Sequence, residues 1–317
     1  MKSKTSNKIV IIGAGYVGST TAYTLMQSGL VSEIALIDID LKKAEGEVMD
    51  LNHCLSFTKP ITIKVGTYAD CTDADLIIMT AGPSIQPGGT RLDLAKQNSQ
   101  IMTSIMKEIV KYTREALILV ATNPVDILTQ VAVESVDYNP KKVIGSGTVL
   151  DSARFRYMLS QHCKVDARNV HGYIIGEHGD SEVAAWSLTH IAGAPLDEYC
   201  SSCNSKICTG LDKEKLLHDV RDAGYHIIDR KVATYYGVSM AIKRISEAIL
   251  RNEHSILTVS SMQTGAYGIN GIAMSVPTIV SSDGIHKIVE LKLSDSELML
   301  LKKSGEKLQS ILDYIKS

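Results

Sequence analysis

The sequence has no long apolar run. None of its stretches reaches the about 18 consecutive apolar residues that a membrane-spanning helix needs. The apolar run Ile9–Ile12 near the N-terminus is also far too short for the core of a secretion signal. These absences predict a protein that neither crosses a membrane nor is secreted, and we expect it in the cytoplasm.

Clustered positive charge is missing as well. The formal net charge is −2, and the lysines and arginines form no long run. A nucleic-acid-binding surface requires a basic stripe that can neutralise phosphates. We therefore expect no nucleic-acid partner.

Cysteine is sparse, with six residues in 317. That density excludes a disulfide scaffold. Cys200 and Cys203 form a C-x-x-C pair, which is compatible with a redox or a zinc role. No second pair and no histidine cluster at ligand spacing completes such a site, so we predict no metal and interpret the cysteines as reduced thiols.

What the sequence does contain, in its first half, is a regular alternation of short apolar runs and helical patterns. The expected helices are 19–28, 42–51 and a long one around 101–110, where apolar residues recur at every fourth position. The expected strands are 8–12, 34–37, 61–64, 76–80, 117–122 and 142–144. Apolar strands alternating with helices predict an α/β fold with a doubly wound parallel sheet that is covered on both faces.

The second half has a different pattern. Helical stretches at 151–161, 213–230 and 238–250 alternate with β-like segments at 170–175 and from 256 to 279, and a helix follows from Ser294. This mixture predicts an α+β domain. We place the domain boundary near Gly145–Gly147, which gives a first domain of residues 1–146 and a second of residues 147–317.

A glycine signature opens the first expected helix. Gly13, Gly15 and Gly18 follow the first strand in G-x-G-x-x-G spacing, which suits a tight turn, close approach to a pyrophosphate and helix–strand packing. Asp38 ends the second strand 20 residues after Gly18, where a carboxylate accepts hydrogen bonds from ribose hydroxyls. The pattern predicts a Rossmann-type domain that binds NAD rather than NADP. The alternative is a glycine turn in an α/β domain that binds no nucleotide.

Polar clusters follow several of the expected strands, where open α/β sheets bind ligands. The segment 82–91 is rich in glycine and proline and ends in Arg91, a composition typical of a mobile lid. Asp151 and Arg154 are three residues apart and share a helix face. His178 lies between glycines, and taken alone it is more typical of a solvated loop histidine than of a catalytic one.

Four segments together resemble the L-lactate dehydrogenases of the lactate/malate dehydrogenase superfamily. They are Thr90–Leu94, Asn123–Leu128, Gly145–Arg156 and Gly176–Glu182. The resemblance extends along nearly the whole chain, and the short N-terminus is similar to that of bacterial members.

The resemblance implies a role for each of these residues. His178 would be the proton donor and acceptor, Asp151 would hold its imidazole, and Arg91 would polarise the substrate carbonyl. The substrate-binding residues would be Arg154 for the carboxylate, with Asn123, Thr234, Ile85, Gln86 and Asp126. The cofactor would be NAD, contacted by Gly13, Gly15, Val17, Gly18, Asp38, Lys43, Tyr68, Gly82, Ser104, Thr122, Asn123 and Ser146.

The lid departs from the family pattern. Ile85 stands where lactate enzymes usually carry Gln and malate enzymes carry Arg, and Gln86 follows it. An apolar Ile85 would leave a second carboxylate unpaired, which argues against a malate enzyme. The expected reaction is therefore between pyruvate and L-lactate, with bulkier apolar 2-oxo acids as the alternative. A non-catalytic NAD-binding protein is disfavoured because His178, Asp151, Arg154 and Arg91 are all present.

Arg156 and His171 match the positions that bind fructose 1,6-bisphosphate in allosteric bacterial lactate dehydrogenases. The resemblance implies activation by that bisphosphate in a homotetramer, because the sites form between subunits. The alternative is a surface arginine and a strand histidine with ordinary partners.

Overall fold

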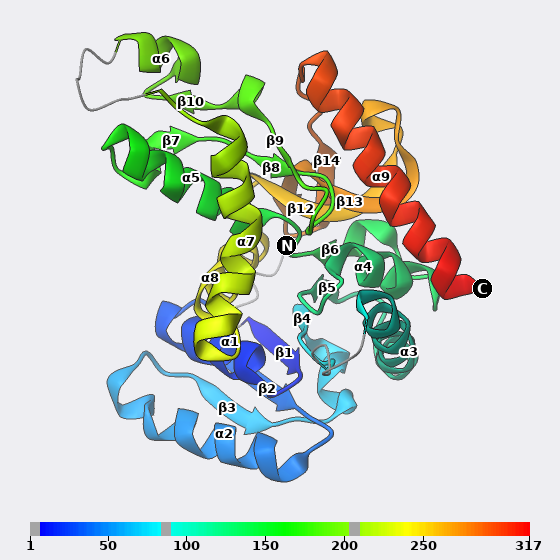
Figure 1. Cartoon of the computed structure of the whole chain (residues 1–317). Helices are drawn as coiled ribbons and strands as arrows, with labels where there is room; N and C mark the ends of the chain where they lie inside the picture. Colours follow the sequence, from blue (N-terminus) through cyan, green and yellow to red (C-terminus); the bar gives the residue numbers. More distant parts are fainter. Residues whose placement is uncertain (1–6, 84–89, 203–209) are drawn as a thin grey trace.

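The computed structural model describes residues 7–83, 90–202 and 210–317. Its described part centres on one nine-stranded sheet (Figure 1). Across the sheet the strands run β3 (Thr62–Val65), β2 (Glu33–Ile37), β1 (Lys8–Ile12), β4 (Leu76–Met79), β5 (Leu117–Val120), β6 (Val143–Gly145), β12 (Ser255–Thr264), β13 (Asn270–Ser281) and β14 (Gly284–Ile288).

The first six strands are parallel, as the sequence predicts. Successive side chains of a strand point to opposite faces, so the two faces of β1 are packed by different helices. Ile9 and Ile11 pack in a cluster with α1 (Tyr16–Ser28), α2 (Leu41–His53) and α8 (Tyr236–Leu250). Val10 and Ile12 pack with α3 (Arg91–Ile109) and α4 (Val125–Glu134) on the other face. This is the doubly wound arrangement.

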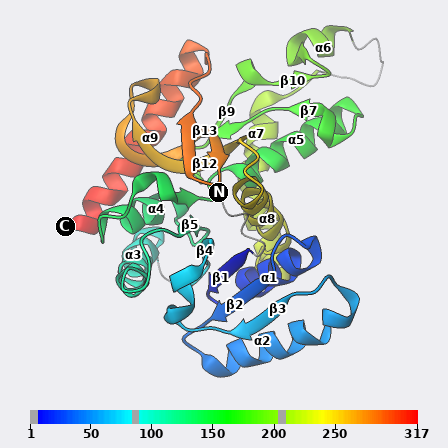
Figure 2. The ribbon, with the colours of Figure 1, turned by 180° about the vertical axis from the view of Figure 1, so that it is seen from behind.

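The sheet does not stop at the expected domain boundary. β12 pairs antiparallel with β6, joining Ser260 to Gly145, and β13 and β14 extend the sheet further. From the second half, α8 also returns to lie against α1, where the hydroxyls of Thr21 and Ser239 are 3.2 Å apart; both views show these two helices side by side (Figures 1 and 2). The division into residues 1–146 and 147–317 therefore stays a prediction.

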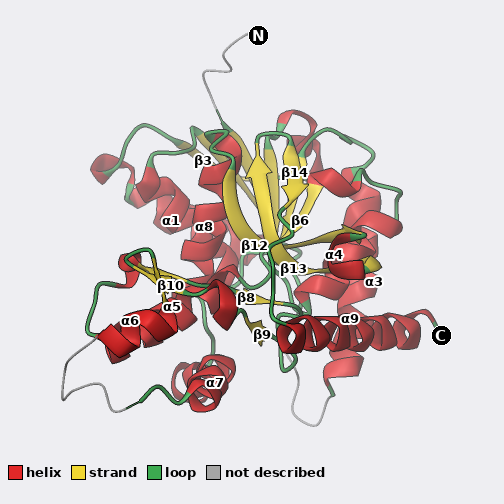
Figure 3. Ribbon diagram, turned by 90° about the horizontal axis from the view of Figure 1, so that it is seen from above, coloured by secondary structure: helices red, strands yellow, loops and turns green. Residues whose placement is uncertain are grey.

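The rest of the second half forms an α+β layer beyond the end of the sheet. Short strands make a three-stranded sheet and a two-stranded one. The three-stranded sheet contains β7 (Val170–His171), β10 (His190–Ile191) and β11 (Ala194–Pro195), and the other contains β8 (Ile174–Ile175) and β9 (Val183–Ala184). The helices are α5 (Val149–Cys163), α6 (Leu196–Ser202), α7 (Lys213–Lys231) and α9 (Asp295–Lys316), and one end of α9 lies beside β9 (Figure 3).

No helix in the described residues is long and apolar enough to cross a membrane.

Candidate active site

The glycine signature forms a tight turn between β1 and α1. Gly13 has φ +109°, a backbone conformation that favours glycine. At Gly18 a Cβ would lie 1.8 Å from the carbonyl oxygen of Gly13, so only glycine fits there. Gly15 caps α1 without a side-chain hydrogen bond, and the amino end of the helix is a favourable position for phosphate.

The Asp38 side chain lies against this turn. Its Oδ2 accepts from the backbone N–H of Ala14 at 2.6 Å, and its Oδ1 accepts from Asp40 N–H at 2.9 Å. Lys43, on the first turn of α2, brings its Nζ to 4.0 Å from where a Cβ on Gly15 would stand. A carboxylate beside a glycine turn and a cation over it fit the ribose and pyrophosphate of a dinucleotide.

The carboxyl ends of β4 and β5 lie close to the glycine turn. Thr122 donates its hydroxyl to the carbonyl of Ala81 at 2.9 Å, next to Gly82. Asn98 on α3 donates from its amide to the carbonyl of Asn123 at 2.7 Å, while its own Oδ1 is buried and has no partner within residues 7–83, 90–202 and 210–317. The structure thus brings the strand-end residues together, with an acceptor that a bound group could satisfy.

The remaining cofactor candidates are spread around this region. Ser146 is buried and joins β6 to β5 through its backbone N–H and the carbonyl of Val120. Val17 packs against the core cluster of α1 and α8, and Tyr68 packs against the cluster on the other face. Ser104 lies on the exposed side of α3.

The group predicted to catalyse comes together around Asp151. His178 Nδ1 lies 2.6 Å from Asp151 Oδ2, and Arg154 Nη1 donates to Asp151 Oδ1 at 2.8 Å. Asp151 and Arg154 occupy neighbouring turns of α5, so one helix face presents both. The Asp151 side chain is 2% exposed and that of His178 is 25% exposed. A buried carboxylate therefore orients a histidine whose ring still reaches the surface.

The charges of this group favour a protonated histidine. Burial lowers the pKa of His178, but the charge and the hydrogen bond of Asp151 outweigh it and raise the pKa to about 9. Burial in turn raises the pKa of Asp151, and the opposing cations His178 and Arg154 bring it below its usual range. The pair is thus held as imidazolium and carboxylate at neutral pH.

Two elements hold the loop that carries His178. From α4, the buried Asp126 accepts the backbone N–H of His178 at 2.7 Å. Burial raises the Asp126 pKa to about 6. The sequence groups Asp126 with the substrate-binding residues, but the geometry supports a role in holding the loop.

α9 holds the loop from the other side. Ser304 accepts the backbone N–H of Glu177 at 2.8 Å, and Lys307 donates to the Glu177 carboxylate at 2.8 Å. The same carboxylate accepts the backbone N–H of Ser181 at 3.1 Å. These residues could not be predicted from the sequence, because nothing along the chain links α9 to residues 177–181.

Comparison with known proteins identifies the family. Residues 7–145 match the NAD binding domain of lactate/malate dehydrogenase, and residues 148–317 match the alpha/beta C-terminal domain of the same family. The chain belongs to the lactate/malate dehydrogenase family.

Individual members of the family are similar over almost the whole length. The L-lactate dehydrogenase of Acetivibrio thermocellus is 55% identical over 311 residues, covering 98% of each chain. L-lactate dehydrogenase 1 of Clostridium acetobutylicum is 52% identical over 313 residues, covering 98% of this chain and 99% of its own. The ligand-bound crystal structure of the minor L-lactate dehydrogenase from Enterococcus mundtii superimposes with a TM-score of 0.93 at 42% identity, covering 98% of both chains.

Some of the family positions lie partly or wholly outside the described residues. Ile85 and Gln86 are among the residues that are not described. Arg91 begins α3, and the description does not extend to its side chain. Thr234 lies in the connection between α7 and α8, partly exposed. Of the C-x-x-C pair, Cys200 belongs to α6 and Cys203 is not described.

The two residues of the expected bisphosphate site lie on adjoining elements. Arg156 is on α5 with a buried Nε that has no partner among the described residues, and burial lowers the pKa of the guanidinium. His171 is exposed on β7, directly opposite His190 of β10. α5 packs against β7, so both side chains belong to the same region of the molecule.

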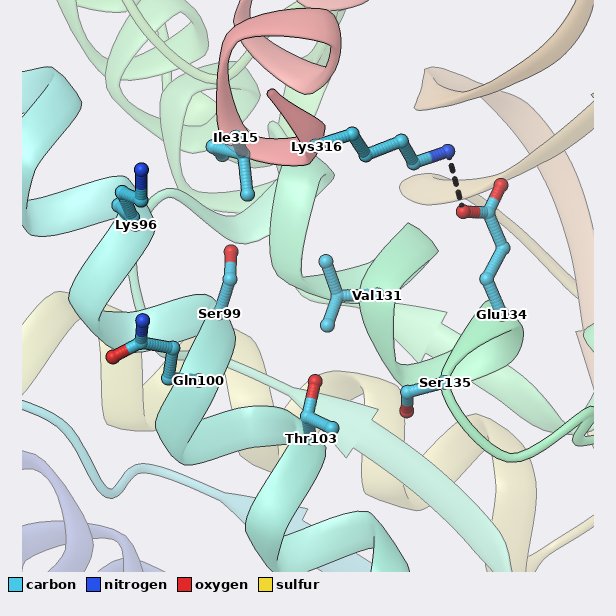
Figure 4. Close-up of a pocket in the computed structure, with 9 residues that line it drawn as sticks. All are labelled: Lys96, Ser99, Gln100, Thr103, Val131, Glu134, Ser135, Ile315 and Lys316. Carbon is cyan, nitrogen blue, oxygen red and sulfur yellow. Dashed lines mark ion pairs between the residues drawn. The ribbon is translucent and has the colours of Figure 1, made fainter.

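A separate pocket of about 440 Å³ lies where α3, α4 and the end of α9 meet (Figure 4). Lys316 pairs with Glu134 at 2.9 Å beside it, and the hydroxyls of Ser99 and Ser135 are buried with no partner in the described part of the chain. None of the predicted site residues lines this pocket.

Proposed function

We propose that this chain reduces pyruvate to L-lactate with NADH, and runs the reverse reaction with NAD, using His178 as the acid/base. The observation that carries the proposal is the contact of His178 Nδ1 with the buried Asp151. Because Nδ1 is committed to Asp151, the other ring nitrogen is the one that meets the substrate oxygen. This arrangement, with one ring nitrogen at the aspartate and the other at the reacting group, is typical of a catalytic histidine held by a buried aspartate.

The substrate carboxylate would bind Arg154. A guanidinium has five N–H donors, and one nitrogen is engaged by Asp151, so a fork remains for a carboxylate. Asp151 thus positions the substrate anchor and the histidine together. Arg91 would approach from the start of α3 to polarise the carbonyl, with Asn123 and Thr234 beside the substrate.

The residues around the glycine turn would hold the cofactor, with Asp38 at the ribose and Lys43 near the phosphates. Bound NADH supplies the hydride that reduces the carbonyl carbon. The chain's own part is to bind, to orient and to move one proton. His178 gives its proton to the carbonyl oxygen during reduction and takes it back from the hydroxyl during oxidation.

We also propose activation by fructose 1,6-bisphosphate at Arg156 and His171. The buried Arg156 Nε, which no described residue pairs, supports this proposal, because a phosphate oxygen would satisfy that donor. Pairing with an anion would also relieve the burial cost of the guanidinium.

A homotetramer is the assembly we propose. Large apolar side chains are exposed on neighbouring helices of the sheet, among them Tyr16 and Tyr23 on α1, Met49 on α2, and Tyr236 and Met240 on α8. The ring centroids of Tyr16 and Tyr235 are 5.5 Å apart, so this surface is continuous from α1 to the start of α8. Exposed apolar patches of this kind are typical of subunit interfaces.

The cytoplasmic location stays a prediction.

The test is a set of steady-state rates with pyruvate, longer 2-oxo acids and oxaloacetate, each with and without fructose 1,6-bisphosphate. We expect the highest kcat/KM for pyruvate and a poor rate with oxaloacetate, since Ile85 offers no charge to a second carboxylate. A preference for the longer 2-oxo acids would support the alternative of a broader 2-hydroxy acid dehydrogenase. A preference for oxaloacetate would contradict the proposal.

A further inference from the structure

Glu182 is a buried carboxylate that the proposed mechanism does not use. It follows the His178 loop at the start of β9 and is 2% exposed. Its Oε1 is buried and has no hydrogen-bond partner among the described residues. A buried charge normally has a partner, so an unsatisfied carboxyl oxygen this close to the catalytic group needs a reason.

Arg221 of α7 contacts the backbone of Glu182. The guanidinium Nη2 of Arg221 donates to the backbone carbonyl of Glu182, and its Nε is buried with no partner in the part of the chain that the structure describes. Gly224 is one turn further along the same face of α7, and a Cβ there would lie 3.9 Å from Arg154 Nη2. One face of α7 therefore packs over both Glu182 and the substrate anchor.

The charged groups that face Glu182 come from three elements. Asp151 and Arg154 are on α5, His178 is on the same loop, and Arg221 is on α7. Burial and the charge of Asp151 raise the pKa of Glu182 to about 8, while the three cations oppose that rise. Asp126 of α4 also faces His178, and both Asp126 and Glu182 help to hold the proton on its ring.

We propose that Glu182 is a positioning residue that acts through His178 and keeps the imidazole protonated into the alkaline range. The inference rests on the proposed role of His178. At neutral pH Glu182 carries its proton, so it adds no negative charge to the buried group of His178, Asp151 and Arg154. As pH rises, Glu182 ionises, and its negative charge then opposes loss of the proton from His178. Arg221 holds the backbone of Glu182 in place for this.

The test is the pH profile of kcat/KM for pyruvate in the Glu182→Gln variant. We expect its falling alkaline limb to move to lower pH by about 0.5 to 1 unit, because the neighbouring negative charge is gone. Glu182→Asp should restore most of the shift. Glu297→Gln is the matched control, because Glu297 is also buried but its carboxylate accepts the backbone N–H groups of Ser187 and Ser294. An unmoved limb in folded Glu182→Gln, or an equal shift in Glu297→Gln, would overturn the inference.

A second measurement needs no variant and no turnover. The infrared band of a protonated carboxyl group should be present in the unmodified protein at about pH 7 and lost by about pH 9.5, a range in which ordinary Asp and Glu do not titrate. If no such band disappears over that range, the inference fails even where the variant does not fold.

The two proposals also fail separately: normal turnover in a His178 variant would remove the acid/base role, whereas the carboxyl titration would stand.

Discussion

At the scale of the residue, His178 shows how a side chain acquires its chemistry from its neighbours. Along the sequence it is a histidine between glycines, a pattern typical of a solvated loop. In the fold it faces Asp151, 27 residues earlier, and its backbone is held by Asp126, 52 residues earlier. The contact of Asp151 with Arg154 follows from helical spacing, but the approach of His178 to both depends on tertiary structure.

The raised pKa of His178 predicts a pH dependence. In the proposed mechanism reduction needs the imidazolium, so kcat/KM for pyruvate should be flat at neutral pH and fall as pH rises through about 9. Oxidation of L-lactate needs the neutral ring and should rise over the same range. Asp151→Asn removes the anion that stabilises the imidazolium, so its falling limb should move toward the ordinary histidine value. Initial rates in both directions measure this, and a limb near about 6.5 in the unmodified protein would contradict it.

Three of the residues that support the site could not be predicted from the sequence. Ser304 and Lys307 lie on the last helix, more than 120 residues from the loop that they hold, and nothing in their helical pattern distinguishes them from surface residues. The charge environment of Glu182 likewise depends on α5 and α7 packing around it.

At the scale of the element, α9 is a brace for the catalytic loop. Buried residues of α9 pack with residues of β13 in one hydrophobic cluster. One turn of α9 supplies both Ser304 and Lys307, which bond to residues 177–181. A brace that fixes the backbone of Glu177 also fixes the adjoining His178. We therefore expect the helix to affect catalysis through the position of this loop.

Weakening this brace should lower turnover more than cofactor binding. In Lys307→Met we expect kcat to fall about tenfold, because the Glu177 carboxylate loses a charged hydrogen bond and the loop loses its fixed geometry. Lys303→Met, an exposed change on the same helix, is the control and should leave kcat unaltered. Rates together with NADH binding by fluorescence measure this; an unchanged kcat in Lys307→Met would show that the loop does not need α9.

The apolar runs of the first half predicted its strands well, because buried parallel strands are continuous apolar segments. They did not predict α4. Seven of the ten residues of that helix are buried, including the polar residues Asp126, Thr129 and Gln130, so its polar positions do not mark a solvent-facing side. The addition of β12–β14 to the sheet was also not predicted, since the pairing of Ser260 with Gly145 joins distant segments.

At the scale of the whole molecule, both halves build the candidate site. The first supplies the glycine turn and the ends of β4 and β5, and the second supplies Asp151, Arg154 and His178. β6 and β12 lie side by side and join the halves within one sheet. The site therefore lies at the carboxyl ends of the parallel strands, where open α/β sheets bind ligands.

Assembly and activation should depend on the same two residues. We expect the Arg156→Gln, His171→Gln double variant to lose any rate increase caused by fructose 1,6-bisphosphate and any bisphosphate-dependent change in size on gel filtration. Lys111→Gln is a distant control, because Lys111 is exposed and paired with Glu108 on α3. A double variant that still responds fully would place the regulatory site elsewhere.

The most direct test of the account is the turnover of His178→Asn with pyruvate and NADH. The account predicts a fall in kcat of about 10³-fold or more, with NADH binding retained, because the proton donor is lost while the glycine turn and Asp38 are untouched. Near-normal turnover in a folded His178→Asn variant would contradict the account.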